Sequence, residues 1–208
     1  MSLRLEMLQV ARVAPKALED ASDLVRDFLL SQQHPDGGFC DRDGESDLYY
    51  TVFGLNALAA FQVEPDMNAV EKFLLKFEEG EGLDLVHLSC LCRCWGTLGQ
   101  KRMPKGLRKV LLNRLEAFRK PCGGWDNNPE REHGTAYGSF LALGAYQDLG
   151  KLPPKPFRIL QSLKHLETPD HAWNNHPNLP VGSTNPTAGA VVLLNNLHLP
   201  INAEVGKW

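Results

Sequence analysis

The sequence Asp-Gly-Gly-Phe at residues 36–39 recurs in altered form twice further along the chain. Residues 122–125 read Cys-Gly-Gly-Trp, and residues 170–173 read Asp-His-Ala-Trp. Each copy follows an amphipathic segment and precedes a polar turn and a run of small and apolar residues. We expect the glycines to allow positive φ angles and close backbone approach, and the aromatic residue to fill the gap between neighbouring hairpins. Because recurrence is typical of repeat proteins, these loops predict a fold of repeated helical units.

The apolar runs supply one half of each predicted unit. They cover residues 48–61, 83–98, 135–149 and 184–197. These runs contain few charged residues and many Gly and Ala residues. Since a helix that is apolar on nearly all sides is buried, we expect these four helices to form an inner layer.

Amphipathic segments between the runs supply the other half. They cover residues 16–33, 66–78, 104–119 and 156–167. A proline stands near the start of each segment, where its missing N–H removes no helical hydrogen bond. These helices carry charged residues on one face, so we expect them to form an outer layer.

Together the two helix types predict an all-α fold. The predicted architecture is an αα-toroid, or partial α/α barrel, of about four helical hairpins with alternating inner and outer helices. We expect residues 1–208 to form a single repeat domain. The predicted repeats span approximately residues 16–61, 66–98, 104–149 and 156–197.

Charge and composition narrow the classes of function. The formal net charge is −3 and the pI is about 6.2, which argues against a nucleic-acid partner or a polybasic membrane surface. No apolar run reaches the roughly 18–20 residues of a transmembrane helix. The first residues lack the pattern of a signal peptide, and five cysteines, an odd number, suit a reducing compartment. We therefore expect a cytoplasmic protein without a transmembrane segment.

The first repeat resembles a known family. Residues 32–39 (Gln-Gln-His-Pro-Asp-Gly-Gly-Phe) and 47–55 (Asp-Leu-Tyr-Tyr-Thr-Val-Phe-Gly-Leu) resemble one repeat of a protein prenyltransferase β subunit, above all that of Rab geranylgeranyltransferase. The Gly-Gly-aromatic loops are also similar to those of squalene and other terpenoid cyclases. The resemblance implies inner helices around an apolar cavity for an isoprenoid chain, with prenyl transfer as the expected reaction.

Several features depart from that family. Its zinc ion is held by an aspartate, a cysteine two residues later and a histidine in an Asp-x-x-His-Thr context, whereas residues 47–51 read Asp-Leu-Tyr-Tyr-Thr. Tyr50 stands where the histidine belongs, and a phenol is not a usual zinc ligand. Zinc is the implied cofactor, but its expected ligands are not all present, so enzymatic activity is left open. The family barrels have about six hairpins, so we expect a partner subunit or a second copy to complete the barrel.

Polar residues at the mouth of the predicted cavity are candidates for catalysis. Asp47 lies eight residues after Phe39, and His133 lies eight residues after Trp125. We therefore assign Asp47 and His133 to equivalent positions, where with Tyr50 they would meet a head group or act as acid and base. The alternative is that they are surface capping residues.

Aromatic residues on the predicted inner helices are candidates for binding an apolar ligand. The alternative is that they form core between the two helix layers. They are Tyr49, Phe53, Trp95, Tyr137 and Phe140.

Asp84, His87 and Cys90 are weak candidates for a metal site, because they follow one another at helical spacing. Cysteine also serves as a small buried hydrophobe, which is the alternative. Two functions follow from these residues. The first is binding of an isoprenoid diphosphate or another apolar small molecule, with prenyl transfer if the protein is active. The second is a non-catalytic repeat scaffold for a protein or lipid partner.

Overall fold

The computed structural model describes residues 2–207 and confirms the all-α prediction. One antiparallel pair of short strands accompanies the helices, with Phe39 opposite Asp47. The described residues contain no helix that is long and apolar enough to cross a membrane. The α-helices are α1 (Leu3–Ala11), α2 (Ala14–Leu18), α3 (Ser22–Ser31), α4 (Leu48–Ala60), α5 (Met67–Leu75), α6 (Leu85–Leu98), α7 (Leu107–Ala117), α8 (Ala136–Asp148), α9 (Phe157–Lys164) and α10 (Thr184–Asn196), and the strands are β1 (Phe39–Cys40) and β2 (Ser46–Asp47).

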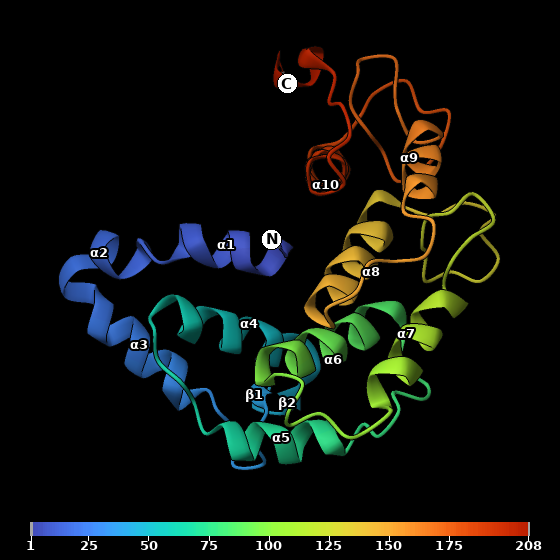
Figure 1. The fold of residues 1–208 in the computed structure, drawn as a ribbon. Coiled ribbons are helices and arrows are strands. Elements are labelled where there is room, and N and C mark those ends of the chain that lie inside the picture. Colours follow the sequence, from blue (N-terminus) through green and yellow to red (C-terminus); the bar gives the residue numbers. More distant parts are fainter. Residues whose placement is uncertain (1, 208) are drawn as a thin grey trace.

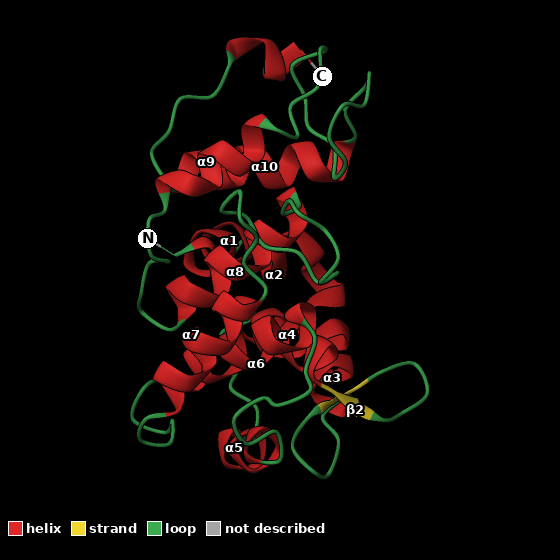
Figure 2. Cartoon of the chain, turned by 90° about the vertical axis from the view of Figure 1, so that its right-hand side faces the viewer, coloured by secondary structure: helices red, strands yellow, loops and turns green. Residues whose placement is uncertain are grey.

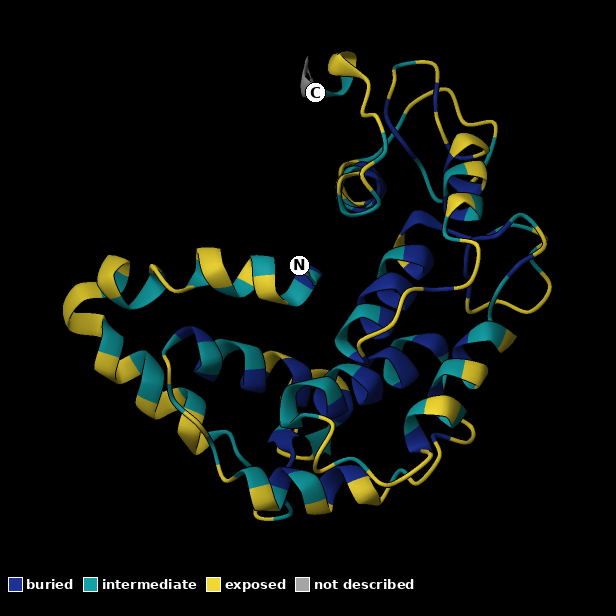
Figure 3. Ribbon diagram, viewed as in Figure 1, coloured by how far each residue is buried: buried dark blue, intermediate teal, exposed yellow. Residues whose placement is uncertain are grey.

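Two layers of helices form an open curve. α4, α6, α8 and α10 contact one another in sequence along its inner side, and α3, α5, α7 and α9 follow its outer side (Figure 1). The view from the side shows the same stack, with α9 and α10 at the opposite end from α3 and α5 (Figure 2). Burial is deepest on α6 and α8, in the middle of the stack (Figure 3). The predicted inner and outer helices therefore take the predicted layers.

The three related loops share one backbone arrangement. In each, the aromatic residue is at most 4% exposed, and its N–H donates to a hydroxyl in the following inner helix. The indole N–H of Trp125 also donates to Leu115 O (3.0 Å), and that of Trp173 to Leu163 O (3.1 Å). The third loop is therefore a true copy, although both of its glycines are replaced. The shared bonds join Phe39 N to Thr51 Oγ1 (2.9 Å), Trp125 N to Ser139 Oγ (3.3 Å) and Trp173 N to Thr187 Oγ1 (3.0 Å).

Both the backbone conformation and the close packing require glycine at the first position of each Gly-Gly pair. Gly37 and Gly123 have φ angles of +102° and +104°, a region that side chains rarely adopt. A Cβ at Gly37 would also lie 1.9 Å from Ala69 O of α5, and one at Gly123 would lie 2.4 Å from Arg158 Cβ of α9. These glycines therefore let each loop pack directly against the next outer helix.

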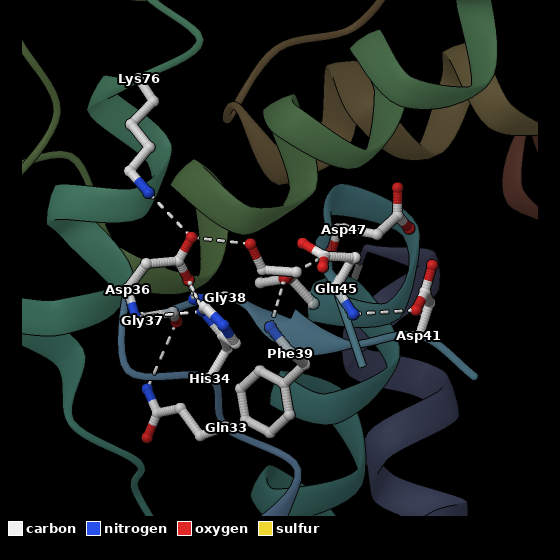
Figure 4. A network of polar contacts seen from close by, with 12 residues as sticks. Gln33, His34, Asp36, Gly37, Gly38, Phe39, Asp41, Glu45, Asp47 and Lys76 are labelled. Carbon is white, nitrogen blue, oxygen red and sulfur yellow. Dashed lines mark hydrogen bonds and ion pairs between the residues drawn. The ribbon is translucent and has the colours of Figure 1, made fainter. Parts of the chain in front are cut away.

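Asp36 fastens the first loop to the next hairpin. Its Oδ2 accepts hydrogen bonds from Lys76 Nζ (2.8 Å) and Ser46 Oγ (2.7 Å), and its Oδ1 accepts from Gly38 N (3.0 Å) (Figure 4). Partial burial opposes ionisation of this carboxyl, but these donors outweigh it and hold the pKa of Asp36 well below its usual value. The loop and α5 are therefore joined by polar contacts as well as by close packing.

The N-terminal residues differ from the prediction. The helix expected at residues 16–33 is interrupted, because Glu19 has a φ of +47° and a short 3-10 turn separates α2 from α3. Helix α1, which the sequence did not predict, lies on the inner side of the curve and contacts α4 and α8 (Figure 1). The concave face is therefore built from α1 as well as from the inner helices.

Candidate functional site

The N-terminal ends of α4, α6 and α8 lie side by side at one edge of the curve, here called the rim. Asp47 caps α4 by accepting from Tyr49 N (2.7 Å) and Tyr50 N (3.0 Å). Asp84 caps α6 by accepting from His87 N (2.8 Å). Such side chains satisfy N–H groups that the first helical turn leaves unpaired. The capping role expected of Asp47 as the alternative is thus present, and it also places its carboxylate at the rim.

His87 lies between the two capping aspartates. Its Nδ1 is 2.7 Å from Asp84 Oδ1, and its Nε2 is 3.7 Å from Asp47 Oδ2. Partial burial opposes ionisation of Asp84, but hydrogen bonds from the backbone and ring of His87 lower its pKa. An imidazole that is oriented by one carboxylate and faces another has the arrangement typical of a general acid or base. The rim therefore offers an acid–base group that joins two repeats.

His87 holds in α6 the position that Tyr50 holds in α4. Residues 84–87 read Asp-Leu-Val-His, so His87 stands three residues after its helix cap, as Tyr50 does after Asp47. The sequence pattern predicts His87 only as part of a candidate metal site. The Asp-x-x-His spacing identifies the position of His87 when residues are counted from the helix cap. Counting from an aromatic loop is not possible in this repeat, because the repeat has no such loop.

The predicted equivalence of Asp47 and His133 is wrong. Phe39 pairs with Asp47, whereas Trp125 O accepts from Thr135 N (2.9 Å). Thr135 also caps α8, so Thr135 corresponds to Asp47. The loop after Trp125 is two residues longer than the loop after Phe39, and this shifts His133 out of register. In the described residues no hydrogen bond or ion pair joins His133 to Asp47, and the buried His133 Nε2 has no hydrogen-bond partner.

Asp84, His87 and Cys90 do not converge on a metal site. The side chains of Asp84 and His87 are each 41% exposed, whereas Cys90 lies in the core. Burial raises the pKa of the Cys90 thiol to about 12, so it is protonated at neutral pH and is a poor zinc ligand. Within residues 2–207, no three His, Cys, Asp or Glu side chains are placed to hold one ion. The residues present therefore do not fit the zinc centre that the resemblance implies.

Aromatic side chains on α4 and α8 are exposed to an unusual degree. Tyr49, Tyr50, Phe53 and Tyr137 are 39%, 37%, 51% and 46% exposed. The rings of Tyr49 and Phe53 make an edge-to-face contact at 4.8 Å. Burial and the neighbouring Tyr49 raise the pKa of Tyr137. A group of exposed large apolar residues is typical of a binding surface.

Trp95 differs from the other predicted ligand-binding residues. It is fully buried in the core, so the alternative interpretation applies and it does not line the concave face. Phe140 is half-buried and borders two adjoining hollows along α8 and α10, with volumes of about 280 and 320 Å³. The first of these hollows shares Tyr137 with a rim pocket of about 390 Å³ between α6 and α8. A hollowed surface therefore runs from the rim along α8.

The rim pocket has one polar side and one apolar side. Arg131 and Asp126 form an ion pair (3.0 Å) on the polar side, and Leu85 and Leu141 line the apolar side. This pocket therefore offers both polar and apolar contacts to a ligand. Comparison of the sequence with protein-family models and with curated proteins finds no match.

Proposed function

We propose that this protein binds an isoprenoid or similarly apolar chain on its concave face, as the prenyltransferases and terpenoid cyclases do. The observation that carries the proposal is the exposure of Tyr49, Phe53 and Tyr137 on inner helices, beside hollows with mainly apolar walls. Covering such surface with an apolar chain contributes about 25 cal/mol for each Å² removed from water. A bound isoprenoid would therefore stabilise a face that is otherwise hydrated.

The rim supports a chemical role beside the proposed binding face. The Asp84–His87 pair and Asp47 supply a proton donor and acceptor where the inner helices begin. Prenyl transfer is the reaction that the resemblance favours, with an isoprenoid diphosphate as substrate. Because the side chains do not fit a zinc centre, we propose no role for zinc in this reaction. We also propose a cytoplasmic location and a partner subunit or second copy that extends the open curve.

A second candidate function is a non-catalytic repeat scaffold. It is favoured by apolar residues on the N-terminal helices, where Val10, Leu24 and Phe28 are 74%, 73% and 58% exposed. The terminal units of repeat proteins need a polar outer face to stay soluble. An apolar end therefore favours a protein or lipid partner at α1–α3.

Native mass spectrometry with farnesol, geranylgeraniol and their diphosphates tests the proposed function. We expect one ligand to remain bound per chain. Combining Phe53→Ala with Tyr137→Ala should lower affinity about tenfold or more, because two apolar contacts are lost. Phe157→Ala is the matched control, since this residue is 59% exposed on the outer helix α9. If none of the four compounds stays bound to the wild-type protein, the isoprenoid proposal is wrong and the scaffold function remains as the candidate.

A further inference from the structure

Two arginines on the concave face share a single carboxylate. Arg4 Nε of α1 lies 3.3 Å from Asp148 Oδ1, and Arg93 Nε of α6 lies 3.5 Å from Asp148 Oδ2. The Asp148 side chain is 1% exposed and each arginine side chain is 17% exposed. In both guanidinium groups the contact to Asp148 is made by Nε, and within residues 2–207 their Nη atoms donate no hydrogen bond. Two cations with free donors are therefore held side by side in a largely buried place.

The charges in this cluster do not balance. Arg4 and Arg93 bring two positive charges and Asp148 brings one negative charge. The nearby Glu6 of α1 is engaged elsewhere, since its Oε2 accepts from Asn196 Nδ2 (3.4 Å). Removing an unbalanced charge from water is costly, so a second anion at this place would be favourable. Arginine donors also bind carboxylate and phosphate oxygens in paired geometry.

An apolar hollow adjoins the two arginines. It has a volume of about 270 Å³ and lies between α1 and α4, toward the C-terminal halves of the inner helices and away from the rim. Along α1, the lining passes from Arg4 to Met7, Leu8 and Ala11. The facing wall consists of Phe53, Asn56, Ala57 and Ala60 of α4. The hollow is thus positively charged at one end and mainly apolar along the rest.

We propose that Arg4 and Arg93 bind the anionic head group of an amphipathic ligand whose apolar tail fills the hollow between α1 and α4. The inference rests on the proposed function and narrows it, because it names the ligand as an isoprenoid or aliphatic chain that ends in an oxyanion. Both a carboxylate and a phosphate have this chemistry. The Asp148 carboxylate holds the two guanidinium groups in place, and the ligand oxyanion accepts from their free Nη donors.

Calorimetric titration with three farnesyl compounds separates the tail from the head group. Farnesol carries the tail alone, farnesoate adds a carboxylate and farnesyl diphosphate adds phosphate. We expect both anions to bind the wild-type protein about tenfold or more tightly than farnesol, as charged hydrogen bonds predict. Whichever anion binds more tightly identifies the head group. If farnesol binds and neither anion binds more tightly than farnesol, this proposal is overturned and the proposed function stays intact. If none of the three compounds binds, the proposed function is refuted.

Three substitutions test the arginines themselves. Arg4→Gln should lower the affinity for the two anions about tenfold and leave the affinity for farnesol unchanged. Arg12→Gln is the matched control, because Arg12 follows the same helix, is exposed and makes the same change in charge. Asp148→Asn removes the carboxylate that holds the two guanidinium groups in place, so it should weaken anion binding while leaving farnesol binding unchanged. If the cluster has a purely structural role, Arg4→Gln and Asp148→Asn should lower the affinity for all three ligands equally. That result would overturn the proposal.

Discussion

Replacing Gly37 by alanine tests the packing that joins one hairpin to the next. Gly37 and Gly44 lie on either side of β1, in the segment between α3 and α4, with φ angles of +102° and +86°. Alanine at either position is strained by about 1–2 kcal/mol, because the left-handed region disfavours a Cβ. At Gly44 the added Cβ meets no atom within 4 Å, whereas at Gly37 it would lie 1.9 Å from Ala69 O. The two variants therefore share the backbone strain and differ in the collision with α5.

The collision sets the size of the expected difference. An ordinary Cβ contact is 3.4 Å or longer, so α5 must move by more than 1 Å from the loop. That movement loosens Val70, Phe73 and Leu74, which are at most 2% exposed. Loss of close packing at three such residues costs about 3 kcal/mol or more. We expect Gly37→Ala to lower the free energy of unfolding by about 4–5 kcal/mol and Gly44→Ala by about 1–2 kcal/mol.

Urea denaturation followed by circular dichroism measures both values. For a chain of this size, 1 kcal/mol corresponds to about 2–4 °C in Tm, so thermal unfolding gives an independent check. If Gly37→Ala fails to fold while Gly44→Ala folds normally, the ordering is still as expected. Equal destabilisation by the two substitutions would refute the reasoning, because it would mean that contact with α5 contributes nothing.

Two further predictions concern the loops. Ser139→Ala should destabilise the protein by about 1–3 kcal/mol in urea, because it leaves the buried Trp125 N–H without its acceptor; the exposed Ser31→Ala is the control, and equal effects would contradict the prediction. Because its donors keep the pKa of Asp36 low in the folded state, its stabilising effect is complete above its ordinary pKa of about 3.9 and is lost as the pH falls below that value. Asp36→Asn should therefore lose less stability than the wild-type protein between pH 5 and pH 3, and parallel losses would count against this role of Lys76 and Ser46.

Composition was sufficient to predict the layers of helices. The runs that became α4, α8 and α10 have few charges and many small residues, so burial on several sides was predictable from the chain alone. The aromatic loops were predictable because the same residues recur before each run. Even the degenerate copy ending at Trp173 keeps the backbone hydrogen bond to a helix hydroxyl that the first two copies make. These features depend on contacts within one hairpin, which the sequence of that hairpin specifies.

The direction in which an inner side chain points was not predictable. Trp95 and Tyr137 both lie on helices that are apolar on most sides, yet Trp95 is fully buried and Tyr137 is 46% exposed. A helix with apolar residues all round gives no periodic signal that separates the core-facing side from the concave side. Neighbouring helices decide this, and their placement depends on contacts between hairpins.

Loop length limited the prediction of the rim. Counting eight residues from each aromatic residue paired Asp47 with His133, but the longer loop places Thr135 at the helix cap. Counting from the helix cap would have paired Tyr50 with His87, because a cap has a fixed relation to the helix and a loop does not. The acid–base group at the rim therefore comes from the second repeat, whose missing aromatic residue made it the least recognisable copy.

The concave face combines parts of the chain that local patterns cannot bring together. α1 contributes Arg4 and one apolar wall, α6 contributes Arg93, and α8 contributes Asp148. α1 buries Leu3 but leaves Met7 and Val10 exposed, so apolar packing alone gives it a weak hold on the inner helices. Its position depends on polar contacts to α8 and α10 as well. The arginine cluster therefore serves two purposes, because the same Asp148 carboxylate that anchors α1 also holds together the two cations proposed to bind the ligand.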